Sequence, residues 1–97
     1  MPYLIKAHDY AGVLDKRMAV REAHLASLAD LKAQGKVLFA AALLDDKGDL
    51  CGSTMFLDLA FAEIQEMLKT EPYITAGVWD KDRIEIIPIK VAPGFGK

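Results

Sequence analysis

The chain has 97 residues, of which 53% are hydrophobic and 27% charged, and its formal net charge at pH 7 is −2. This composition is typical of one globular domain spanning residues 1–97. The lack of any long run of Lys or Arg argues against nucleic-acid and anionic-membrane partners, because both require a concentrated basic surface. With one cysteine, no expected leader and no apolar run long enough to span a membrane, we expect a cytoplasmic protein without disulfides.

Hydrophobic patterning predicts six regular elements in the order strand, helix, strand, strand, helix, strand. They are a strand over 3–8, a helix over 15–34, strands over 37–44 and 50–57, a helix over 60–69 and a strand over 83–91. Asp15 is the expected N-cap of the first helix and Gly35 its C-terminal stop. Pro72 begins a short helical turn, and Pro88 indicates that the last strand lies at a sheet edge or breaks there.

This βαββαβ order is the ferredoxin-like arrangement, an α+β fold with an antiparallel sheet and two helices on one face. The free face of such a sheet normally contacts water, and its strands should then alternate polar and apolar residues. The segments 37–44 and 83–91 are apolar on both faces instead. A second copy of the sheet would cover them, so we expect a homodimer, with a mobile tail over 91–97.

One histidine occupies an unusual place on the first helix. His24 falls on the same stripe as the apolar residues Val20, Leu28 and Leu31, which must face the sheet. Arg17 and Arg21 lie on the same side, two turns and one turn nearer the N-terminus. His24 is therefore either a hydrogen-bonded core residue or the centre of a functional site, and residue type and position leave these alternatives evenly balanced.

The other reactive residues favour simpler interpretations. His8 lies at a strand end, Cys51 has no evident base beside it and is expected to be an inert thiol, and Trp79 is expected to pack. Two histidines and one cysteine without ligand spacing predict no metal site.

Several short motifs together resemble the YciI-like (YCII-related) family over nearly the whole chain. They are AHD at 7–9, KR at 16–17, VREAHL at 20–25, GS at 52–53 and EPYITAGVW at 71–79. The resemblance implies a ferredoxin-like domain that dimerises into an α+β barrel. It also implies enzymatic activity, since the family has a histidine at the position of His24 and an aspartate where this chain has Glu71, and some members resemble dehydrochlorinases.

The resemblance also implies which side chains form the site. His24, Glu71 and Asp9 are the candidate catalytic residues, and the partner of His24 is either Glu71, one methylene longer than the family's aspartate, or Asp9. Arg17 and Arg21 match the family and are expected to hold an anionic substrate or a structural carboxylate. Two further substrate-binding candidates, Ser53 and Tyr73, come from the shared GS and EPY motifs.

These residue types support proton transfer on a small molecule. A histidine with a carboxylate that fixes its tautomer can act as general acid or base, and an arginine can stabilise carboxylate or enolate charge. We therefore expect a lyase or isomerase that needs no metal and no redox cofactor. The alternatives are a dimeric binding or regulatory protein for a small anionic metabolite and a purely structural dimer.

Overall fold

The computed structural model describes residues 2–95, and their elements follow the predicted order. The elements are β1 (Tyr3–Asp9), α1 (Leu14–Ala33), β2 (Val37–Leu44), β3 (Leu50–Leu57), α2 (Phe61–Thr70), α3 (Pro72–Thr75) and β4 (Trp79–Pro88). The predicted ferredoxin-like α+β class is confirmed. The short turn expected after Pro72 is the helix α3.

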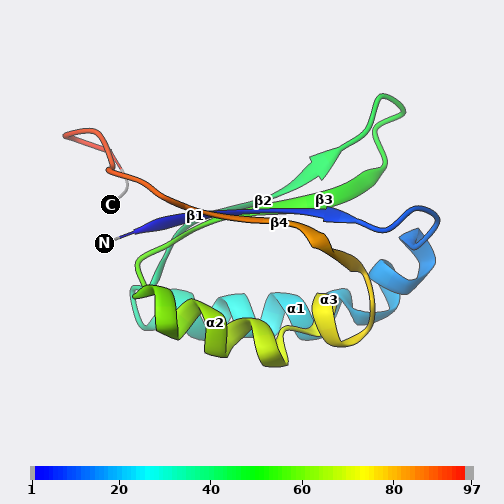
Figure 1. Ribbon diagram of the computed structural model, residues 1–97, viewed down its shortest axis with the longest axis horizontal. Helices are drawn as coiled ribbons and strands as arrows, with labels where there is room; N and C mark the ends of the chain where they lie inside the picture. Colours follow the sequence, from blue (N-terminus) through cyan, green and yellow to red (C-terminus); the bar gives the residue numbers. More distant parts are fainter. Residues whose placement is uncertain (1, 96–97) are drawn as a thin grey trace.

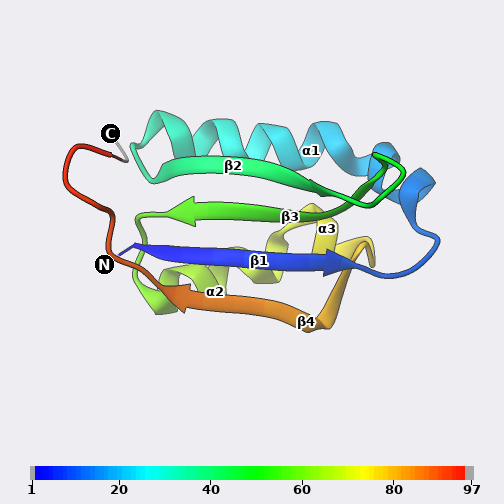
Figure 2. The same cartoon turned by 90° about the horizontal axis from the view of Figure 1, so that it is seen from above.

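The sheet has the strand order β2-β3-β1-β4, and every neighbouring pair is antiparallel. All three helices lie on one face of it (Figure 1). Seen from above, α1 runs along the β2 side, whereas α2 and α3 lie toward β1 and β4 (Figure 2). Over the described range, none of the helices combines the length and hydrophobicity that crossing a bilayer requires.

The core lies between the sheet and the helices. Each fully buried large apolar side chain contributes about 1.5–3 kcal/mol relative to an exposed one. The buried apolar residues are Ile5, Ala7, Met55, Leu57, Leu59, Ile64, Tyr73, Val78 and Trp79.

Two predicted boundaries were wrong. Val13 is the N-cap of α1 and makes no side-chain capping bond, while Asp15 lies in the first turn, where a carboxylate still favours the positive end of the helix dipole. The last strand begins at Trp79, because Trp79 pairs with Asp9 beyond a register shift in β1, and it ends at Pro88. The stop at Gly35 is confirmed, since Gly35 has a φ of 71°, which glycine adopts without strain.

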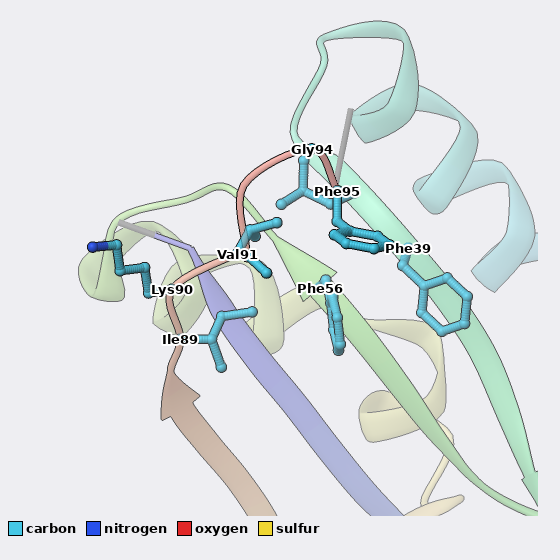
Figure 3. A pocket seen from close by; sticks show the side chains of 9 residues that line it. Phe39, Phe56, Ile89, Lys90, Val91, Gly94 and Phe95 are labelled. Atoms are coloured by element: carbon cyan, nitrogen blue, oxygen red, sulfur yellow. The ribbon is translucent and has the colours of Figure 1, made fainter.

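The outer face of the sheet carries no helix. It exposes Phe39, which is 51% accessible, and Ile87, which is 37% accessible. At one end, Phe39, Phe56, Ile89, Val91 and Phe95 line an open apolar cavity of about 740 Å³ (Figure 3). The tail expected over 91–97 is described as far as Phe95, and 96–97 lie outside the described residues.

One close approach in the sheet gives a testable consequence. A Cβ at Gly52 would lie 2.5 Å from the Ala7 carbonyl oxygen and 2.9 Å from Leu43 Cδ1. We expect Gly52→Ala to lower the free energy of unfolding by about 1–3 kcal/mol, because the backbone of β1 must shift. Urea denaturation measures this, with Thr54→Ala on the same strand as the control. A Gly52→Ala variant as stable as the wild type would contradict this packing.

Candidate functional site

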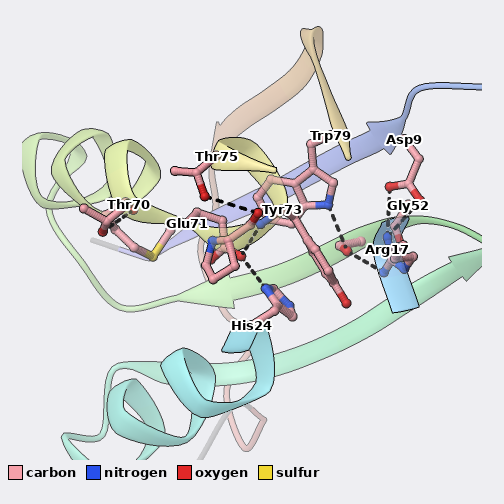
Figure 4. A network of polar contacts seen from close by, with 12 residues as sticks. Asp9, Arg17, His24, Gly52, Thr70, Glu71, Tyr73, Thr75 and Trp79 are labelled. Atoms are coloured by element: carbon pink, nitrogen blue, oxygen red, sulfur yellow. Dashed lines mark hydrogen bonds and ion pairs between the residues drawn. The ribbon is translucent and has the colours of Figure 1, made fainter. Parts of the chain in front are cut away.

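The site forms where α1 crosses the start of α3. His24 is 5% exposed, and its Nδ1 lies 2.5 Å from Glu71 Oε1 (Figure 4). Glu71 is also the N-cap of α3, where Oε1 accepts the backbone N–H of Tyr73 at 3.3 Å. The carboxylate is thus held by a helix start and can accept Nδ1–H, which leaves Nε2 as the basic nitrogen of the neutral ring.

Aromatic rings fix the plane of this imidazole. The Tyr73 ring stacks on His24 with centroids 4.0 Å apart and an interplanar angle of 21°. Trp79 meets the imidazole edge-on at 5.8 Å. Burial raises the pKa of the Tyr73 phenol, and the nearby Arg17 and Arg21 only partly oppose this shift. The phenol is therefore uncharged at pH 7.

Arg17 is the second buried centre of the site. It is 3% exposed, and its Nη1 donates to both carboxylate oxygens of Asp9 at 2.9 and 3.0 Å. Nη2 donates to the Gly52 carbonyl at 3.0 Å and to Ser53 Oγ at 2.9 Å, and Ser53 Oγ also accepts Trp79 Nε1–H at 3.2 Å. The guanidinium therefore ties α1 to both central strands.

The Arg17 cluster and the His24 pair share Tyr73. Arg17 Cζ lies 4.5 Å from the centroid of the Tyr73 ring, the same ring that stacks on His24. Burial raises the pKa of the Asp9 carboxyl above its ordinary value, and the neighbouring Arg17 opposes this shift without cancelling it. Asp9 is thus engaged with Arg17, and His24 has Glu71 as its partner.

A cavity of about 210 Å³ opens beside His24. It is lined by Arg21, His24, Leu25 and Leu28 of α1, by Ala40–Ala42 of β2 and by Ser53–Met55 of β3. Within residues 2–95, Arg17 Nε is the one buried side-chain nitrogen or oxygen without a hydrogen-bond partner. His24 Nε2 makes no hydrogen bond to any described residue. Because His24 lines the cavity, the imidazole is adjacent to the space that a small molecule would occupy.

The two arginines have different environments. Arg17 is buried and committed to partners inside the protein. Arg21 is exposed at the cavity and forms no ion pair with any residue that the structure describes. A guanidinium that stays free at a cavity can bind an anionic group without breaking an existing contact.

The structure brings together most of the predicted site. His24, Glu71 and Tyr73 form one contact group, and Asp9, Arg17 and Ser53 form the adjoining one. The lining alanines of β2 and the leucines of α1 were not predicted as site residues, although the unbroken run of small residues in 40–42 was a possible signal.

His8 and Cys51 lie apart, at another cavity of about 330 Å³ near the loop before α1. The described part of the chain contains no cluster of His, Cys, Asp and Glu suited to a metal ion.

Comparison with known proteins places this arrangement in a family. Residues 1–90 match the model of the YCII-related domain. Protein YciI of Escherichia coli O6:H1 is 35% identical over 97 residues, covering 93% of this chain and 97% of that protein. A Haemophilus influenzae protein is 37% identical over 86 residues, covering 81% of this chain and 88% of that protein.

A solved structure is also similar. It is 5-chloro-2-hydroxyhydroquinone dehydrochlorinase from Burkholderia phenoliruptrix AC1100, in complex with 2,5-dihydroxybenzoquinone. It superposes with a TM-score of 0.83 at 26% identity, covering 95% of this chain and 96% of that chain. The similarity supports a small-molecule enzyme in broad terms, and the sequence matches establish that the chain belongs to the YCII-related domain family.

Proposed function

We propose that the protein is a cofactor-independent enzyme that catalyses proton transfer on a small anionic molecule, with His24 as the general acid and base. The supporting observation is the His24–Glu71 pair beside the cavity of about 210 Å³. A buried carboxylate holds Nδ1, while Nε2 makes no hydrogen bond within residues 2–95 and His24 lines the cavity.

The chemistry follows from this geometry. His24 Nε2 takes a proton from a hydroxyl or carbon of the substrate, and Glu71 stabilises the imidazolium that results. The electron pair released in the substrate forms a C=O or C=C bond, and a leaving group departs with the electrons of its own bond. Where no group leaves, returning the proton to another atom gives an isomerisation.

Arg21 supplies the complementary charge. Its unpaired guanidinium beside His24 can stabilise the oxyanion that forms as the proton leaves. The similar dehydrochlorinase acts on a chlorinated hydroxyhydroquinone, which is a hydroxylated ring with a halide leaving group. We therefore propose hydroxylated or halogenated ring compounds as the substrate class and elimination of HCl as the leading reaction.

The remaining candidate residues of the site hold α1 and the imidazole of His24 in place. Arg17 and Asp9, with Ser53, hold α1 on the sheet, so that His24 lies over Glu71. Tyr73 orients the imidazole by stacking, and its side chain is buried. Asp9, Arg17 and Ser53 are thus positioning residues in this proposal.

The proposal includes a homodimer formed by the outer sheet faces. Strands of eight residues rise about 3.3 Å per residue, and four strands lie about 4.8 Å apart, so the face covers roughly 500 Å². Two such faces together bury roughly 1,000 Å², the lower limit of a specific interface. The exposed Phe39 and Ile87 suit a second copy of the same apolar surface.

The catalytic role of His24 is tested by chloride release from 5-chloro-2-hydroxyhydroquinone. We expect His24→Gln to lower kcat by about 10²–10⁴, because the variant loses the proton-transfer group. Glu71→Gln should also lower kcat, and Glu71→Asp should retain more activity than Glu71→Gln because it keeps the carboxylate. The matched control is His8→Gln, at the other cavity.

Full chloride release by His24→Gln would exclude the proposed base. Binding of 2,5-dihydroxybenzoquinone to the wild type without turnover of any hydroxylated or halogenated ring compound would favour the binding-protein alternative.

The positions of the two arginines predict different effects. Arg17→Met leaves the Asp9 carboxylate buried without its cation and should lower the free energy of unfolding by about 3–5 kcal/mol. Arg21→Met should change the free energy of unfolding by less than about 0.5 kcal/mol, since Arg21 is exposed. It should weaken the binding of 2,5-dihydroxybenzoquinone, because the cation at the cavity is lost. Urea denaturation and ligand titration measure the two effects. An unchanged stability of Arg17→Met would show that its network is not structural.

The dimer is tested by light scattering during size-exclusion chromatography. We expect a dimeric mass for the wild type and a monomeric mass for Phe39→Lys, because the charge would be buried in an apolar interface without a partner. The control is Met18→Lys, which replaces a residue that is 50% exposed on the helical side. A wild-type monomer at all concentrations would contradict the proposal.

A further inference from the structure

The cavity beside His24 exists because the inner side of β2 is left uncovered. Ala40 pairs with Met55 and Ala42 with Ser53, and directly opposed residues share a face of the sheet. Met55 and Ser53 are buried beneath the helices, yet both alanines remain exposed. The short side chains of β2 therefore leave a slot between α1 and the sheet.

The lining of this slot combines apolar and polar side chains, and its polar members are Arg21 and His24 of α1 and Ser53 and Thr54 of β3. Leu25, Leu28 and Met55 contribute apolar walls, and the methyl groups of Ala40 and Ala42 face inward from β2. Arg21 lies three residues before His24, so the two side chains are neighbours on the surface of α1. Such a slot suits a flat apolar body that presents an anionic group and an acidic proton to the same end.

The volume sets an upper size for that body. A cavity of about 150 Å³ accommodates benzene, and one water molecule takes up about 30 Å³ of liquid. The slot of about 210 Å³ therefore holds one six-membered ring with about two further heavy atoms. A fused two-ring body exceeds this volume, so part of it would lie outside the slot and gain less from burial.

We infer that Ala40 and Ala42 are specificity-determining residues that restrict the site to single-ring anions. The inference rests on the proposed function, because it assigns the slot to the substrate of His24. Adding methyl groups at either position reduces the volume of the slot while leaving His24 and Arg21 in the sequence unchanged. Removing the methyl group makes room for a larger ring system.

The test measures binding and not turnover. The probes are benzoate and 2-naphthoate, and the readout is the dissociation constant from the NMR shift of the His24 imidazole. The wild type should bind benzoate about tenfold more tightly than 2-naphthoate, and Ala40→Val or Ala42→Val should weaken benzoate binding by about tenfold or more. The Ala40→Gly/Ala42→Gly double variant should reduce or reverse the preference. The matched control is Ala26→Val, exposed on α1, and thermal melting verifies that each variant is folded.

Three results would overturn the inference. In the first, the ratio of the benzoate and 2-naphthoate dissociation constants stays the same in all variants. In the second, Ala26→Val and Ala42→Val change benzoate binding equally. In the third, neither probe shifts the His24 signal of the wild type. Failure of the proposed function would give a different result. The ratio of the benzoate and 2-naphthoate dissociation constants would still change in the variants at positions 40 and 42, while His24→Gln would leave chloride release unchanged.

Discussion

The buried guanidinium of Arg17 is the contact on which the arrangement of the site depends. It joins α1 to β1 through Asp9, to β3 through Ser53 and the Gly52 carbonyl, and to α3 through the ring of Tyr73. A cation removed from water in this way is tolerated only when its partners are in place, so the network favours one position of the helix on the sheet. Lysine could not replace it, because a single ammonium group lacks the planar fork that reaches both strands at once.

The position of α1 then determines what His24 can do. Two turns beyond Arg17, the imidazole meets Glu71 at the start of α3, and the same carboxylate caps that helix. Stacking on Tyr73 restricts the ring further. One carboxylate therefore caps the start of α3 and holds the imidazole of α1. The other arginine, Arg21, is exposed and forms no ion pair with a described residue.

Much of this fold follows from local patterns in the sequence. Alternating and continuous apolar runs and Gly35 after the first helix are local features, and they predicted the element order and the sheet class. The predictions were wrong or incomplete where a residue distant in the sequence determines the local structure. β4 begins at Trp79 because Asp9 pairs with it across a register shift, and nothing near the charged run 80–83 indicates this. The choice between Glu71 and Asp9 as partner of His24 likewise depended on where the Arg17 side chain goes, since residue spacing alone left both carboxylates possible.

The apolar run of β2 has different surroundings on its two sides. Toward the outer face, Phe39 lies against Phe56 in an exposed apolar surface, which the proposed dimer would cover. Toward the helices, Ala40 and Ala42 present only methyl groups, and the space that they leave lies beside His24. Large residues on one side and small ones on the other are compatible because successive side chains of a strand point to opposite faces. Within eight residues, a hydrophobic segment can therefore contribute both to an exposed apolar surface and to the wall of a cavity, the two features on which the proposed dimer and the proposed binding slot rest.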